Sequence, residues 1–138
     1  MTQSYAPIVV SLPIADRRIS YEFYRDGLGL AATGEPAADG LPEPLQFVIN
    51  DGLRIMLVPT GGFGWVIGHH EVALRGHSEC VLGLDTATVA EVDHLIARVR
   101  DAGAEIVTEP AQQPWGYAGV FADPDGHLWM VTTGAQPD

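Results

Sequence analysis

Three histidines and a glutamate near the middle of the chain are the side chains best suited to chemistry. His77 and Glu79 are two positions apart, so in a strand both would lie on one face, where they could form a pair of metal ligands. His69 and His70 are adjacent and would point to opposite sides of a strand. Because glycine-rich surroundings are typical of an exposed loop, a metal role is the less favoured interpretation of these histidines.

Nucleophilic chemistry has little support in the sequence. Cys80 is the only cysteine, which excludes an intrachain disulfide. Its position in an apolar strand favours a small buried residue over a reactive thiol. The chain contains no Gly-x-Ser-x-Gly motif, phosphate-binding loop or dinucleotide fingerprint.

The composition excludes nucleic acid as a main partner. The chain has seven arginines, no lysine and 18 acidic residues, which gives a formal charge of −11. Nucleic-acid binding requires clustered basic residues. A negative surface favours a cationic ligand, with solubility as the alternative explanation. No apolar run is long enough for a membrane helix. Residues 1–6 show no basic segment followed by an apolar core, so we expect a cytoplasmic protein without membrane contact.

The first half of the chain predicts a strand, a helix and a hairpin. Residues 7–15 alternate as in a strand, and Asp16 can cap a helix over 17–28. Strands at 45–50 and 53–58 then flank the turn Asn50-Asp51-Gly52.

The second half repeats this order. A strand at 79–85 precedes a helix that Thr88 and Glu91 open as a capping box and that ends at Ala102-Gly103. A short strand at 104–108 and a loop at 111–114 lead to a hairpin over 115–133, which turns at Asp123-Pro124-Asp125-Gly126. Two further stretches, 34–44 and 59–78, have the composition of loops, and the first of them that of a mobile loop.

The repeated order predicts an α+β fold made of two βαβββ modules. The modules cover about 7–60 and 78–134, with a linker at 61–77, in a single domain spanning 1–138. A module of this kind has one apolar sheet face and cannot close a core alone. Two modules side by side would make a curved sheet with helices outside and a cleft inside.

Three segments resemble the vicinal oxygen chelate superfamily, which includes glyoxalase I, extradiol dioxygenases and bleomycin-type resistance proteins. They are Val9 to Asp16, the run Phe23-Tyr24-Arg25-Asp26-Gly27-Leu28-Gly29-Leu30, and Gly119 to Met130 with its Asp-Pro-Asp-Gly turn. The resemblance covers nearly the whole chain. It implies a cup-shaped mixed sheet and a homodimer.

The resemblance also implies four inward-facing positions at which related enzymes hold a divalent metal with His, Glu or Gln. In this chain they are Val9, about Met56, Glu79 and Met130. Divalent ions need oxygen or imidazole donors, which valine and a thioether do not supply. We therefore expect no metal and no cofactor.

Glu79 is the one ionisable side chain among these positions. If it faces an apolar cup, desolvation would raise the pKa of the carboxyl group and make it a candidate general base. The alternative is a carboxylate at the rim that is bonded to a neighbour.

Aromatic and thioether side chains near the implied cup suit a flat organic ligand, and tryptophan faces near acids suit a cationic group. The alternative for each is a place in the core or in a dimer interface. The predicted ligand-binding residues are Val9, Phe47, Met56, Trp65, Trp115, Tyr117 and Met130.

These observations favour a metal-free protein that binds and sequesters a small aromatic or cationic compound, like the drug-binding resistance members. The second hypothesis is an enzyme, either a lyase, isomerase or hydrolase that uses Glu79 as base or a metal enzyme with other ligands. The third is a domain that binds a protein partner and has a vestigial cleft.

Overall fold

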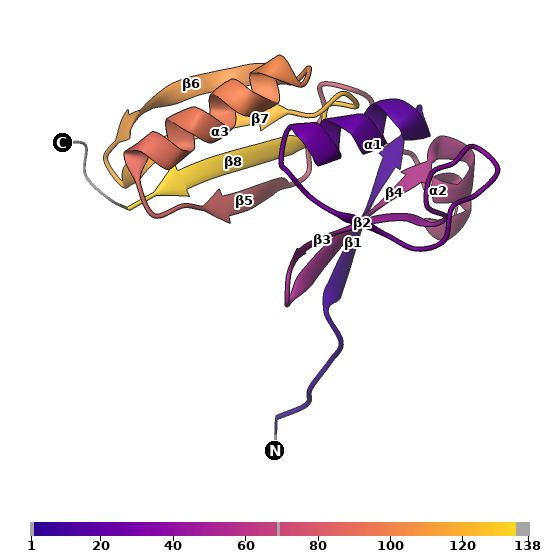
Figure 1. Cartoon of the computed structure of the whole chain (residues 1–138). Coiled ribbons are helices and arrows are strands. Elements are labelled where there is room, and N and C mark those ends of the chain that lie inside the picture. The colour runs from indigo at the N-terminus through magenta and orange to yellow at the C-terminus, as the bar shows by residue number, and fades with distance from the viewer. Residues whose placement is uncertain (1, 69, 135–138) are drawn as a thin grey trace. The chain divides into compact units, whose positions relative to one another are not determined.

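The computed structural model describes residues 2–68 and 70–134. The chain divides into two compact units (Figure 1). Unit 1 comprises Met1–Arg25 and Gly29–Val72, and unit 2 comprises Asp26–Leu28 and Ala73–Asp138. None of the helices in the described ranges is long and apolar enough to cross a membrane.

Unit 1 contains one four-stranded sheet with the strand order β1-β4-β3-β2, in which β1 and β4 are parallel and the other pairs antiparallel. Its elements are β1 (Ile8–Ile14), α1 (Arg17–Asp26), β2 (Ala32–Thr33), β3 (Leu45–Asn50), β4 (Leu53–Pro59) and α2 (Thr60–Val66).

Unit 2 has the same topology. Its sheet has the order β5-β8-β7-β6, again with a parallel first pair and antiparallel pairs after it. The predicted α+β class with two βαβββ modules is therefore confirmed. The elements of unit 2 are β5 (Val81–Asp85), α3 (Val89–Asp101), β6 (Glu105–Gln113), β7 (Gly116–Ala122) and β8 (Leu128–Thr133).

Each unit builds its core between one helix and one face of its sheet. In unit 1, Tyr24 of α1 packs on Phe47 of β3 with ring centroids 5.7 Å apart, and both side chains are fully buried. In unit 2, α3 lies across the sheet (Figure 1) and its Ile96 packs against β7 at Gly119, where a Cβ would come within 3.2 Å of the isoleucine. The burial of these apolar side chains is the main stabilising term in each unit.

Local polar groups begin the helices as predicted. The Asp16 carboxylate accepts hydrogen bonds from the backbone N–H groups of Arg18 and Ile19. The Thr88 hydroxyl accepts from the Glu91 N–H at 3.1 Å, and the Glu91 carboxylate accepts from the Ala87 N–H at 2.8 Å. These bonds satisfy backbone donors that have no partner within the helix.

Both predicted hairpin turns are present. The Asn50 side chain accepts from the Gly52 N–H at 2.8 Å. The buried Asp123 carboxylate accepts from the N–H groups of Asp125 and His127, each at 2.9 Å. Gly126 has φ +92°, a value that glycine adopts at little cost.

Two segments differ from the sequence prediction. Residues 59–78 were expected to be irregular, but Thr60–Val66 forms helix α2 directly after β4, with the Thr60 hydroxyl bonded to the Ile14 carbonyl. Strand β6 continues to Gln113, although 111–114 was expected to be a loop. Register shifts between Ile106 and Ala111 place Pro110 at an irregular part of the ladder, where its missing N–H is tolerated.

The Pro/Gly/Asp-rich loop 34–44 is tied to α1 by two adjacent arginines, of which Arg18 donates to the Asp39 carbonyl at 2.7 Å. Arg17 donates to the Asp39 carboxylate and to the carbonyls of Leu41 and Pro42. The hydrogen bond from Arg17 is the largest cause that lowers the pKa of Asp39, from 3.8 to about 2.

Removing the cap of α3 should destabilise unit 2. Thr88→Ala leaves the Glu91 N–H without its acceptor, so we expect the free energy of unfolding to fall by about 1 kcal/mol in urea denaturation. Thr88→Ser keeps a hydroxyl acceptor and should lose much less. Equal losses in the two variants would contradict the capping role.

The Arg17 contact makes the stability of this loop depend on pH. The pKa of Asp39 is lower in the folded protein than in the unfolded chain. The stabilisation from the Arg17–Asp39 contact is therefore fully present above the usual pKa of 3.8 and is lost as the pH falls towards 2. In Arg17→Gln, carboxyl NMR titration should show the pKa of Asp39 moving back towards 3.8. An unchanged pKa would show that Arg17 does not cause the shift.

Candidate functional site

The face of each sheet that is not covered by α1 or α3 is called its open face. In unit 1 it presents two neighbouring rows of side chains across the strands. Val9, Arg54 and Val48 form one row, and Ser11, Met56 and Gln46 form the next. Val9 and Val48 are 44% and 37% exposed, Arg54 is exposed, and Ser11, Met56 and Gln46 are half-buried. The Gln46 amide donates to the Met56 sulfur at 3.6 Å.

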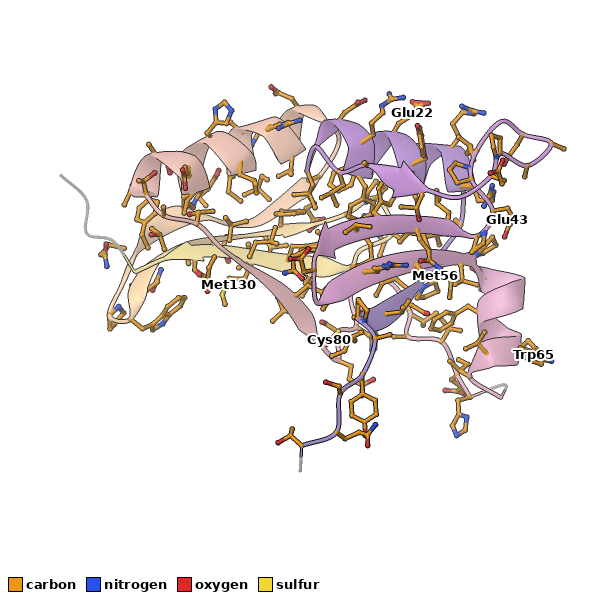
Figure 2. The ribbon with its side chains drawn as sticks, turned by 60° about the horizontal axis from the view of Figure 1, so that its bottom comes forward. Glu22, Glu43, Met56, Trp65, Cys80 and Met130 are labelled. Atoms are coloured by element: carbon orange, nitrogen blue, oxygen red, sulfur yellow. The ribbon has the colours of Figure 1, made fainter. Side chains whose placement is uncertain are left out.

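The open face of unit 2 is built from β5, β8, β7 and β6. Val81, Leu128 and Ala122 form one row, and Gly83, Met130 and Val120 form the next. Val81 is 47% exposed, while Leu128, Met130 and Val120 are half-buried. Beside them the Thr132 hydroxyl donates to the Asp85 carboxylate at 2.7 Å. Figure 2 labels the two methionines, Met56 on β4 and Met130 on β8.

The strand registers relate these two faces position by position. Met56 pairs with Ser11 on the first strand of its unit, and Met130 pairs with Gly83 on the first strand of its own. Val9 lies two residues before Ser11, and Val81 lies two residues before Gly83.

The helix caps give the same correspondence. Val9 stands seven residues before the cap Asp16, and Val81 stands seven residues before the cap Thr88. The duplicated units therefore present the same valine and methionine pair on their open faces.

The metal positions implied by the family do not fit a divalent ion. Val9 and Met130 lie on the open faces and offer no oxygen or nitrogen donor, and the Met56 thioether is a poor ligand for hard or borderline cations. The fourth position, Glu79, lies in a bend before β5 and is exposed. A single carboxylate exposed to water does not hold a metal.

The other ionisable candidates are also exposed. His70, His77 and Cys80 are all at the surface, and the expectation of a buried Cys80 was wrong because β5 begins only at Val81. His69 lies outside the described residues. Within those residues, no three His, Cys, Asp or Glu side chains come together as a metal site. The desolvation that the base role of Glu79 requires is missing at an exposed position, and that role stays a prediction.

Two of the predicted ligand-binding residues lie on the helix-covered faces. Phe47 is 0% exposed against Tyr24 and has no surface for a ligand, so we leave it out of the site. Tyr117 also points towards the helix of its unit, where its hydroxyl donates to Asp93 at 2.6 Å. This hydrogen bond is the main cause that raises the pKa of Tyr117.

The two remaining aromatic candidates lie away from the rows described above. Trp65 is 76% exposed and projects outward from the short helix α2 (Figure 2). Trp115 is 61% exposed in the turn between β6 and β7. Of the predicted ligand-binding residues, the structure thus brings together Val9 and Met56 on one open face and places Met130 on the other.

Sequence reasoning missed the polar residues of the open face of unit 1. Arg54 and Met56 are two residues apart in one strand, so alternation alone puts them on the same face. Ser11 follows from Val9 in the same way. Gln46 needed the antiparallel register between β3 and β4, which the sequence does not state.

A shallow surface groove lies on α3, away from these residues. It is lined by Thr86, Ala90, Glu91, His94, Leu95 and Arg98. The groove contains none of the predicted ligand-binding residues.

The assignment of faces can be tested with two neighbours in β3. Phe47→Ala should cost about 3–5 kcal/mol of unfolding free energy because it leaves a cavity under α1. Val48→Ala, one residue later on the exposed face, should cost less than about 1 kcal/mol. Chemical denaturation measures both values, and a larger loss for Val48 would reverse the assignment.

Comparison with known proteins gives one family. The family model of the Glyoxalase/Bleomycin resistance protein/Dioxygenase superfamily matches residues 8–131. None of the curated proteins matches the chain. Solved structures resemble it over nearly its whole length, and three of them illustrate the match.

The first is the hypothetical protein SA1046 from S. aureus, with 26% identity and a TM-score of 0.78 over 96% of this chain and 95% of that one. A glyoxalase-related enzyme from Fulvimarina pelagi has 26% identity and a TM-score of 0.80 over 96% and 88%. TnmS3, an antibiotic binding protein from Streptomyces sp. CB03234, has 25% identity and a TM-score of 0.65 over 98% and 99%. With the duplicated βαβββ units and the match over 8–131, the chain belongs to the Glyoxalase/Bleomycin resistance protein/Dioxygenase superfamily.

Proposed function

We propose that this protein binds a small, flat aromatic compound on the open faces of its sheets without a metal ion. The observation that carries the proposal is the pair of valine and methionine positions that the two units share, Val9 with Met56 and Val81 with Met130. At three of the four positions where the family resemblance implies metal ligands, Val9, Met56 and Met130, this chain presents aliphatic and thioether surface. Contact between such surface and an aromatic ring is favourable, because it removes apolar atoms from water.

A structural relative supports this proposal. TnmS3 is described as an antibiotic binding protein and covers nearly the same length of chain. Binding of this kind needs affinity alone, so it fits a site that has an exposed apolar surface. The function would then be sequestration, with no bond made or broken. A homodimer and a cytoplasmic location stay predictions.

The neutral fluorophore Prodan, a substituted naphthalene, tests the apolar site. We expect saturable binding with a blue-shifted emission, and Met56→Gln should weaken it about fivefold because a polar amide replaces about 1 kcal/mol of apolar contact. Met130→Gln tests unit 2 in the same way. The matched control is Ile19→Gln, which changes a 55% exposed apolar residue on α1 and should leave the dissociation constant unchanged.

The absence of a metal requirement needs its own measurement. Elemental analysis of protein purified without chelator, then of samples loaded with nickel, zinc, manganese or ferrous iron, should find well below one equivalent. Prodan affinity should not change with EDTA. About one tightly held equivalent per chain, or binding that EDTA abolishes, would overturn the proposal.

A further inference from the structure

In the two rows that hold the valine and methionine positions, the open faces differ in polarity at three corresponding positions. Ser11, Gln46 and Arg54 of unit 1 correspond by register to Gly83, Val120 and Leu128 of unit 2. The valine and methionine positions are the same in both units. At these positions the open face of unit 1 carries polar side chains where that of unit 2 does not, and the polar pair of unit 2, Asp85 and Thr132, lies one row further along.

Two of these polar groups have no side-chain partner among the described residues. The Arg54 guanidinium and the Ser11 hydroxyl form no hydrogen bond or ion pair with any residue in the part of the chain that the structure describes. The Gln46 amide has only the 3.6 Å contact with the Met56 sulfur, a weak acceptor. In unit 2, by contrast, the polar groups Asp85 and Thr132 satisfy each other.

Arg54 is also the exception among the seven arginines. Each of the others contacts a carboxylate, a backbone carbonyl or an aromatic ring: Arg17, Arg18, Arg25, Arg75, Arg98 and Arg100. An arginine flanked by Val9 and Val48 across the ladder, rather than by an acid, keeps all its donors available.

The chemistry of this group favours one sign of charge. Arginine, serine and glutamine can all donate hydrogen bonds, and arginine carries a permanent positive charge. The strand positions of this open face contain neither Asp nor Glu, although the chain has 18 acidic residues. Arg54 lies in the row next to Ser11 and Gln46, within reach of a long side chain.

We infer that the open face of unit 1 binds the carboxylate, or a similar anionic oxygen group, of the small molecule, with Arg54 as its charge partner and Ser11 and Gln46 as further donors. This inference rests on the proposed function and specifies its ligand class as an aromatic acid. Val9, Val48 and Met56 surround Arg54 with apolar surface, so a ring carrying the anionic group can contact them while its oxygens meet the guanidinium.

Three naphthalene derivatives of similar size and different charge test the inference. Calorimetry would measure the dissociation constants of naphthalene-2-carboxylate, the neutral 2-naphthamide and the cationic 2-naphthylmethylammonium. We expect the carboxylate to bind about tenfold more tightly than the amide, as a hydrogen bond to a charged group typically allows. Arg54→Gln should reduce this ratio below about threefold, and Arg54→Lys should keep part of it.

Arg100→Gln is the matched control, because it removes an exposed arginine charge from α3 in the other unit. It should leave the ratio unchanged, and circular dichroism should show that all three variants keep the fold. A ratio near one in the unaltered protein, or one that Arg54→Gln leaves intact, overturns the inference, while binding of the amide alone would still support the proposed function. Failure of all three compounds to bind at millimolar concentration would overturn both.

Discussion

Each unit depends on one constraint, which is that one long helix, α1 or α3, covers one face of a four-stranded sheet, while the short helix α2 of unit 1 contacts β1 and β4 at the end of their ladder. Because side chains alternate along a strand, this cover divides every strand into residues that build the core and residues that do not. Phe47 and Val48 are neighbours in β3, yet the first is fully buried and the second is 37% exposed. The same division puts Trp129 in the core and Met130 on the open face. The residues available for function are those that the helix leaves uncovered.

Duplication allows the two open faces to be compared within one chain. Two copies of a βαβββ unit keep the same register, so corresponding positions experience the same backbone environment. At the valine and methionine positions the copies agree, and both lack the donors that a divalent ion requires. At Arg54 and Leu128 they differ, although nothing in the backbone pairing requires it. This difference is more informative about the proposed ligand than the shared apolar residues are, because apolar residues suit binding and packing equally well.

The charge of the whole chain and the charge at the open face of unit 1 have opposite signs. The formal charge of −11 governs long-range steering and solubility. At contact distance, binding depends on the nearest groups, and these are a guanidinium, a hydroxyl and an amide among apolar side chains. The two effects act over different distances, since salt screens the first within about 8–10 Å. The cationic ligand predicted from net charge and the anionic ligand inferred from Arg54 therefore rest on effects of different range.

Signals that depend on nearby residues were predictable from the sequence. The caps at Asp16 and Thr88, the turn at Asp123 and the alternation in β1 each involve groups a few positions apart, and the structure contains all of them. The family resemblance extended this to the fold class. Helix α2 was missed because Gly61, Gly62 and Gly64 have low helix propensity, which its place after β4 outweighs.

Only the tertiary structure decided which residues share a surface. Val9 meets Arg54 through the parallel pairing of β1 with β4, and Val81 meets Leu128 through that of β5 with β8, across about 45 residues of intervening chain. Phe47 and Tyr117 were predicted to contact a ligand, and both lie on the helix-covered faces of their sheets. The sequence by itself determined the elements and their apolar faces. Pairing register and helix placement depend on contacts between distant segments, so the composition of the open faces became visible only in the folded chain.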